Sequence, residues 1–509
     1  MKTNPWISAV IIIVVSLVLL LPQLGHKSLW PDEAFYAQIA KESPGTILFA
    51  AKNDFHPPGF LLAQHVMISL SGSSEFALRL LPGLAWVGIV LLTWLWGSKV
   101  LSPKIGWAAG LTAAISHFGL LNACNATSYS LFSALSISAL FAFWWAIEGK
   151  GGIKAWVLYA LAQTACVYTH HYGWGTFAAV NLYFLVTLKG RKQQWIPWLL
   201  SNIAVLILYL PLLSTTLQQL TLRTEMLAKI RPHGEGFPII GKRLAGLFYH
   251  LGAGYVFHGP DWGKVIGNPL FWVTAVIVFG MVIGGIIVLI SKPPIALFLG
   301  IFLVVNVAGM VKSEADVLSF PNLTVVFFIL AATAAVKWTE HVKPAFWWVA
   351  MIPLWVVNGV GYGTFSGSTA STIFSVSDYH AAAGWIKSDS QPNDIVMTDL
   401  QKTGTPVFQY YYSGKFIARD HYDEYRYEFC IPGIEVGRFQ STILLKNDLK
   451  DAFDKGASGV WYLTRYGLDK KTRKQADEAI RIFPSDVWDD GELLVVKFHP
   501  QQESDTTDK

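Results

Sequence analysis

The stretch PWISAVIIIVVSLVLLLPQL, residues 5–24, carries no charged side chain and decides the class of this chain. The hydrocarbon core of a bilayer is about 30 Å thick, so a helix needs roughly 20 apolar residues to cross it. Many similar stretches follow, and no small-residue cleavage motif comes directly after this one. We therefore expect an uncleaved membrane-spanning helix rather than a signal peptide.

The composition of the whole chain agrees with this interpretation. Of 509 residues, 53% are hydrophobic and only 14% are charged, whereas soluble domains contain about 25% charged residues. The net charge of +5 is spread along the chain without a basic block, which gives no reason to expect a nucleic-acid partner. The three cysteines show no C-x-x-C spacing, so they predict neither a metal site nor a disulfide framework.

Apolar stretches of membrane-spanning length recur through the first two thirds of the chain. They predict about eleven spans, at residues 5–24, 76–98, 104–123, 128–147, 154–170, 173–188, 196–213, 269–291, 295–311, 317–336 and 345–363. Lys and Arg gather in alternate connections, such as those with Lys99, Lys150, Lys189 and Lys292. Short cytoplasmic loops are enriched in Lys and Arg. We therefore expect a multi-pass plasma-membrane protein with the intervening loops outside.

The character of the sequence changes after the last predicted span. We expect a membrane domain over residues 1–363, with outer loops at 25–75 and 214–268, and a linker of small residues over 364–377. Residues 378–500 alternate short strand patterns, such as DIVMTDL, GVWYLT and ELLVVKF, with amphipathic helix patterns. This alternation predicts a small extracytoplasmic α/β domain, followed by a disordered tail over 501–509.

Two adjacent acids, Asp32 and Glu33, lie in SLWPDEAFYAQIAKES, residues 28–43, just beyond the first span. Carboxylates at the start of a helix are stabilised by the helix dipole and often cap the helix. From spacing alone, a capped interfacial helix is the simpler explanation. Catalysis by one of the acids is the alternative.

Other polar residues gather on the same predicted outer face. His56 lies in NDFHPPGFLLAQ, where two prolines restrict the chain. Arg79 opens a span, where an isolated Arg usually extends its side chain to the lipid headgroups. His170 and His171 end another span in YTHHYG, and adjacent His residues on a helix point in different directions, which makes them a poor metal pair alone.

The order of these motifs resembles that of the GT-C glycosyltransferases. The resemblance rests on DEAFYAQIA, HPPGFLL, EFALRLLP, SYSLFSALSISALF and YTHHYG, and on Pro321 in the tenth predicted span. The similar branch is glycosyltransferase family 39, the protein mannosyltransferases with their bacterial relatives that add aminoarabinose to lipid A. The resemblance is strongest over residues 1–190, and it implies the GT-C architecture in the membrane domain.

The resemblance also implies a reaction. Such enzymes move a sugar from a polyprenyl-phosphate donor to an acceptor on the outer face of the membrane. A carboxylate takes the acceptor's proton, as in inverting sugar chemistry, and cations hold the departing phosphate. The expected roles are Asp32 as general base and Glu33 as its orienting or acceptor-contacting neighbour. The expected substrate-binding residues are His56, Arg79, Tyr129, His170, His171 and Lys312.

Several positions depart from the family pattern. Asn125 and Thr127 replace an acid and an Arg, Glu314 and Ala315 replace an Arg-Tyr pair, and His56 replaces a phosphate-binding Lys of some relatives. These differences leave open which sugar is carried and how its phosphate is held. The acceptor is open among a protein, a glycolipid and a cell-envelope glycan.

Two other functions remain as alternatives. One is a transporter or flippase of lipid-linked sugars, which the scarcity of charges within the spans and the lack of a visible inverted repeat disfavour. The other is a receptor or assembly protein, for which eleven spans exceed what anchoring needs. We expect no cofactor, although a divalent cation could bind if Asp32, His56, His170 and His171 converge.

Overall fold

The computed structural model describes residues 5–230, 269–313, 320–340, 346–367, 378–400, 407–414, 416–419, 437–439, 445–465, 470–489 and 493–501. The chain forms two compact units. One contains residues 1–26 and 40–373, and the other contains residues 27–39 and 374–509.

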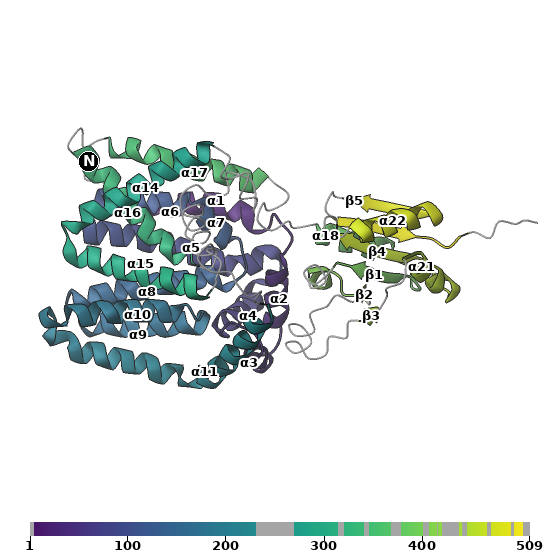
Figure 1. The fold of residues 1–509 in the computed structure, drawn as a ribbon, viewed down its shortest axis with the longest axis horizontal. Helices are drawn as coiled ribbons and strands as arrows, with labels where there is room; N and C mark the ends of the chain where they lie inside the picture. The colour runs from purple at the N-terminus through teal and green to yellow at the C-terminus, as the bar shows by residue number, and fades with distance from the viewer. Residues whose placement is uncertain are drawn as a thin grey trace, which may run out of the picture. The chain divides into compact units, whose positions relative to one another are not determined.

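The first unit is a helical bundle (Figure 1). Its helices are α1 (Pro5–Leu24), α3 (Pro44–Lys52), α4 (Gly59–Ser71), α5 (Glu75–Trp96), α6 (Pro103–Ala114), α7 (His117–Ala123), α8 (Ser128–Ile147), α9 (Gly152–Thr169), α10 (Gly173–Thr187), α11 (Trp195–Ile230), α14 (Pro269–Ile290), α15 (Pro293–Ser313), α16 (Asn322–Glu340) and α17 (Trp347–Gly367). A short π-helix, Gly97–Leu101, prolongs α5, and two 3₁₀ turns precede α11. Helix α8 packs against α9 and α5, and α16 packs against α14 and α6.

The multi-pass helical membrane architecture is confirmed. Each predicted span contains a helix, and seven helices of the described ranges are long and apolar enough to cross a membrane. Helix α16 is the most deeply enclosed, with every residue from Asn322 to Val336 buried. The total of eleven crossings stays a prediction.

Three boundaries differ from the sequence expectation. The span predicted at 104–123 is broken between α6 and α7, because the Ser116 hydroxyl accepts a hydrogen bond from the Gly119 amide and so begins a new helix. Helix α11 continues to Ile230, into the segment predicted as an outer loop from residue 214. Helix α16 begins after Pro321, so this proline precedes the helix instead of lying within it.

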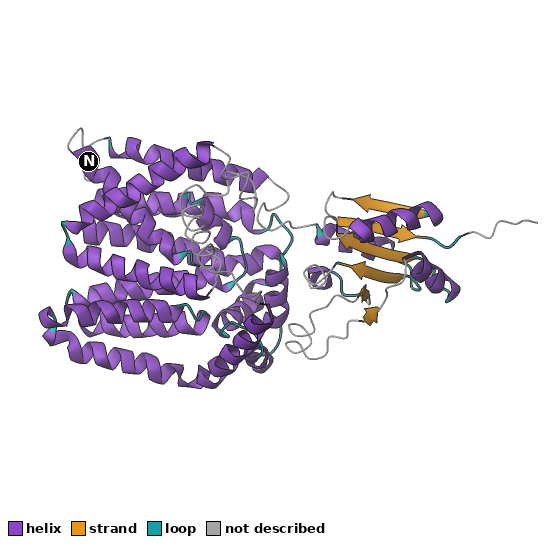
Figure 2. Ribbon diagram, viewed as in Figure 1, coloured by secondary structure: helices purple, strands orange, loops and turns teal. Residues whose placement is uncertain are grey.

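The second unit contains a six-stranded sheet, in orange in Figure 2. Its strands are β1 (Ile395–Asp399), β2 (Ile417–Arg419), β3 (Gly437–Phe439), β4 (Val460–Arg465), β5 (Ser485–Asp489) and β6 (Leu493–Phe498). The order is β3-β2-β1-β4-β6-β5, with the first four parallel and β6 antiparallel to both of its neighbours. The predicted α/β character is confirmed, and three of these strands, β1, β4 and β6, match the three predicted from the sequence.

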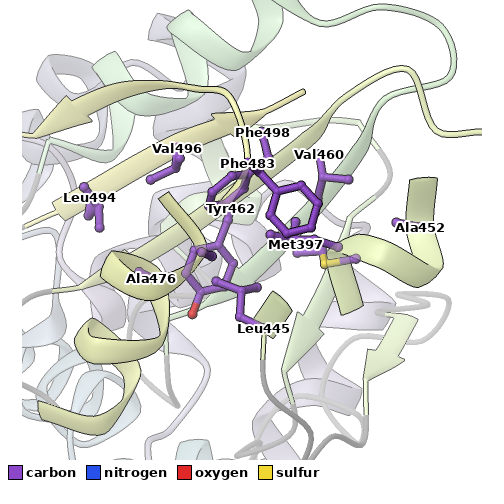
Figure 3. Close-up of a cluster of buried hydrophobic side chains, with 12 residues drawn as sticks. Met397, Leu445, Ala452, Val460, Tyr462, Ala476, Phe483, Leu494, Val496 and Phe498 are labelled. Carbon is purple, nitrogen blue, oxygen red and sulfur yellow. The ribbon is translucent and has the colours of Figure 1, made fainter. Parts of the chain in front are cut away.

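Helices α21 (Leu445–Asp454) and α22 (Lys470–Ile482) cover one face of this sheet. Met397, Val460, Tyr462, Val496 and Phe498 alternate along β1, β4 and β6 and point into one apolar core with them (Figure 3). Trp461 points to the opposite face, where its ring meets Trp385 of α18 (Tyr379–Asp389) edge to face at 4.9 Å.

Helix α2 (Pro31–Ala40), which carries the acid pair, belongs to this second unit except for its last residue. The segment before it bonds directly to the α/β domain. The Leu29 amide donates to the Tyr411 hydroxyl at 2.8 Å, and the Ser28 hydroxyl donates to Asp378 at 3.3 Å. No local sequence pattern predicts this association, because the bonded residues lie far apart in the chain.

Some predictions lie outside the described residues. These are the part of the loop beyond Ile230, most of the linker over 364–377, the tail after residue 501, and Glu314 and Ala315.

Candidate active site

One set of candidate residues lies at the amino end of α2, in the second unit. Pro31 occupies the first helical position, where its missing N–H costs nothing. Glu33, two positions on, turns back so that its Oε2 accepts a hydrogen bond from the Trp30 amide at 2.9 Å. This is one half of a capping box. The Pro-Asp-Glu sequence thus folds locally as a helix start.

The two acids have different environments. Glu33 is 2% exposed and engaged with the backbone, whereas Asp32 is half-buried. Asp32 sits in the first turn, where the helix dipole stabilises a negative charge. Of the pair, Asp32 is therefore the carboxylate that a substrate can approach, and Glu33 is the one that holds the helix start.

A separate set of candidate residues is a group of rings in the helical bundle, centred on His170 at the end of α9. His170 is 4% exposed, and its ring lies 4.5 Å from Tyr172, 5.0 Å from His56, 5.3 Å from Phe132 and 5.7 Å from Tyr129, between ring centroids. The structure thus brings together His56, Tyr129 and His170, three of the predicted substrate-binding residues. Tyr172 in turn stacks on Phe320 at 4.4 Å.

A glycine allows this approach. Gly59 begins α4, and a Cβ there would collide with the backbone carbonyl of Tyr168. Only glycine lets the start of α4 rest directly on the end of α9. The glycine of HPPG therefore allows the backbones of α4 and α9 to touch, and this contact places His56 beside His170.

Gln219 of α11 is a site residue that the sequence analysis missed. Its amide nitrogen donates to the carbonyls of Ala51, at 2.6 Å, and His56, at 2.8 Å. Its amide oxygen lies 2.8 Å from Nε2 of His171. Because that oxygen can only accept, His171 carries its proton on Nε2. One side chain, 2% exposed, thereby ties the His56 loop to His171.

Arg79 is buried in the bundle, 3% exposed, and its Nη1 donates to the carbonyl of Leu24 at 3.1 Å. Leu24 ends α1, so the guanidinium satisfies a carbonyl that has no partner within its helix. Asp54, also buried, places Oδ2 3.4 Å from Nδ1 of His56.

Three predicted site residues remain, namely Lys312, Asp32 and Glu33. Lys312 lies in the last turn of α15, and its side chain is outside the described residues. Asp32 and Glu33 belong to the second unit. Across the described ranges, no three His, Cys, Asp or Glu side chains gather closely enough to hold a metal ion.

Similarity to solved structures extends over nearly the whole chain. ArnT from Cupriavidus metallidurans in the apo state superposes with a TM-score of 0.60 at 14% identity, covering 97% of this chain and 99% of that one. The same protein bound to undecaprenyl phosphate gives a TM-score of 0.59 at 15% identity, covering 98% and 100%.

The oligosaccharyltransferase AglB from Archaeoglobus fulgidus, in complex with an inhibitory peptide and a dolichol-phosphate, gives a TM-score of 0.55 at 12% identity, covering 99% of this chain and 75% of that one. No protein-family model and no curated protein matches the chain. The chain shares the fold of these solved structures, as the motif order implied.

Proposed function

We propose that this chain is a membrane glycosyltransferase that moves a sugar from a polyprenyl-phosphate donor to an acceptor hydroxyl on the extracytoplasmic face of the membrane. One observation carries the proposal: both this chain and ArnT are covered almost completely by the superposition, and ArnT has been captured with undecaprenyl phosphate. The half-buried Asp32 at the start of α2 and the ring group around His170 supply the chemistry.

In the proposed reaction, the Asp32 carboxylate accepts the proton of the acceptor hydroxyl. The acceptor oxygen then bonds to the anomeric carbon from the face opposite the phosphate, which inverts that carbon. The bond from the anomeric carbon to the phosphate oxygen breaks, and its electron pair leaves with the polyprenyl phosphate. A phosphate monoester is a good leaving group, so no strong general acid is required.

The cations have the complementary role. Arg79 and His56, with Lys312, would hold the departing phosphate, since charge-assisted hydrogen bonds to phosphate are the strong ones. Tyr129, His170 and His171 would line the sugar pocket. The burial of Glu33 supports an orienting role for it over a direct contact with the acceptor.

Asp32→Asn tests the proposal in membranes supplied with radiolabelled polyprenyl-phosphate sugars and the extracted envelope as acceptor. Asn cannot accept the proton, so transfer should fall at least 100-fold, the size of a general-base contribution. Binding of the donor should remain, because the side chain keeps its shape. Glu42→Gln, at an exposed acid beyond α2, is the matched control and should retain full transfer.

Two outcomes would count against the proposal. Undiminished transfer by Asp32→Asn would remove the catalytic assignment. Transbilayer movement of the donor in vesicles of the purified wild-type chain, with no transfer to any acceptor, would favour a flippase instead.

A further inference from the structure

The α/β domain holds the segment that leads to Asp32. The Leu29 amide lies ahead of α2 and has no acceptor within that helix, and the Tyr411 hydroxyl accepts its hydrogen bond at 2.8 Å. Leu29 and Tyr411 are separated by 382 positions in the sequence. A backbone donor that is buried, as Leu29 is, needs such a partner.

Tyr411 is itself fixed on several sides by its own domain. Its ring stacks on His380, with centroids 5.2 Å apart and planes 8° from parallel. Its backbone carbonyl accepts a hydrogen bond from the Lys387 ammonium at 2.6 Å. These contacts fix the position of Tyr411 and therefore the position of its hydroxyl.

A second bond runs parallel to the first. The Ser28 hydroxyl donates to Asp378 at 3.3 Å, and the same carboxylate oxygen caps α18 by accepting from the Ala381 amide at 3.0 Å. Two neighbouring residues of the segment are thus attached to two different places on the domain.

The connection from these bonds to Asp32 is short and stiff. Only Trp30 and Pro31 intervene between Leu29 and Asp32. The Trp30 amide is held by Glu33, and the ring of Pro31 fixes its own φ. A displacement of the Leu29 amide therefore also displaces the Asp32 carboxylate.

We propose that Tyr411 is a positioning residue for the Asp32 carboxylate, so that the α/β domain aims the general base of the reaction. This inference rests on the proposed function. It gives the C-terminal domain a part in catalysis that its distance in the sequence from Asp32 does not suggest.

Tyr411→Phe tests the inference in the full-length chain, because it removes only the hydroxyl. A displacement of a reacting group by about 1 Å can cost up to 100-fold in rate, and we expect kcat to fall about 10-fold with KM for donor and acceptor within twofold of wild type. Hydrogen exchange in a peptide covering residues 27–33 should quicken, while β1, β4 and β6 keep their protection. Ser28→Ala, which leaves the domain unaltered, should lower kcat about threefold.

Tyr412→Phe is the matched control. It removes a hydroxyl from the neighbouring residue, whose buried ring packs on Phe408, and it should keep the wild-type kcat. The inference is overturned if Asp32→Asn abolishes transfer but Tyr411→Phe retains the wild-type kcat. It is also overturned if Tyr411→Phe exposes the whole sheet to exchange, because the role would then be structural. Full activity of Asp32→Asn would instead be a failure of the proposed function.

Discussion

At the scale of single residues, Asp32 and Glu33 show how one local motif serves two purposes. Glu33 closes the start of α2 by accepting the Trp30 amide, and this leaves Asp32 as the accessible carboxylate. Helix capping and catalysis are alternatives when the sequence is considered alone. In the folded chain Glu33 caps the helix, and Asp32 is the residue to which we assign catalysis in the proposed function.

Gln219 carries the first prediction at this scale. Gln219→Leu removes three hydrogen bonds, one of them with His171, and leaves the carbonyls of Ala51 and His56 without that donor. Burying a carbonyl without its partner costs about 1–3 kcal/mol, so we expect the unfolding free energy to fall by about 2 kcal/mol or more. The affinity for the lipid donor should weaken as the His56 loop loosens.

The measurement is the apparent melting temperature of the purified protein in detergent, beside the KM for the donor. Gln218→Leu is the control, because Gln218 makes one exposed bond to Asn53 at 3.2 Å. Equal melting temperatures for the two variants would contradict the role given to Gln219.

At the scale of elements, the sequence predicts helices and strands well where the signal is local. The apolar runs of α1, α8, α14 and β4 depend only on neighbouring residues. The break at Ser116 was missed because apolar residues continue on both sides of it. Gln219 and Tyr411 were missed because their partners lie far away in the sequence, and an isolated Gln or Tyr carries no local signal.

Asp394 supports the second prediction, because it joins the starts of β1 and β4. Its carboxylate accepts hydrogen bonds from the Gln391 amide at 3.0 Å, the Ser458 hydroxyl at 2.8 Å and the Trp461 indole at 3.0 Å. Burial alone would raise the pKa of Asp394, but these bonds and the charge of Lys497 together lower it. A lowered pKa in the folded state contributes stability that is present above the unfolded pKa, about 3.9, and is lost as pH falls below it.

Asp394→Asn should therefore destabilise the sheet by about 1–2 kcal/mol at neutral pH, because an amide nitrogen in place of Oδ1 cannot accept the Ser458 bond and the negative charge near Lys497 is lost. Faster hydrogen exchange in peptides from β1 and β4 of the full-length chain is the readout. The wild-type protection should decline below about pH 4, after correction for intrinsic exchange, and that of the variant should depend less on pH. Asp451→Asn, which breaks only an exposed ion pair with Lys455, should change protection little, and an equal effect of both changes would refute the assignment.

At the scale of the whole molecule, two of the connections rich in Lys and Arg lie side by side at one end of the bundle. The Arg191 guanidinium and the Gln194 amide both donate to the carbonyl of Ile147, at 2.7 and 2.8 Å, which joins the turn after α8 to the turn before α11. Tyr129 is in the first turn of α8 and Ile147 is its last residue. A helix of that length spans about 30 Å, so the ring group around His170 lies at the end opposite to these basic turns.

This arrangement predicts the orientation of the chain in the membrane. The basic turns should face the cytoplasm, and an odd number of crossings should place the α/β domain outside. Single cysteines at Lys150 and Lys455, two exposed positions, would be introduced after replacing Cys124, Cys166 and Cys430. In right-side-out vesicles, a membrane-impermeant maleimide should label Lys455→Cys at once and Lys150→Cys only after permeabilisation. Labelling of both cysteines at once, or of neither, would mean an even number of crossings between the two positions. The reverse pattern would put the proposed site on the cytoplasmic face, and this would contradict the proposed extracytoplasmic transfer.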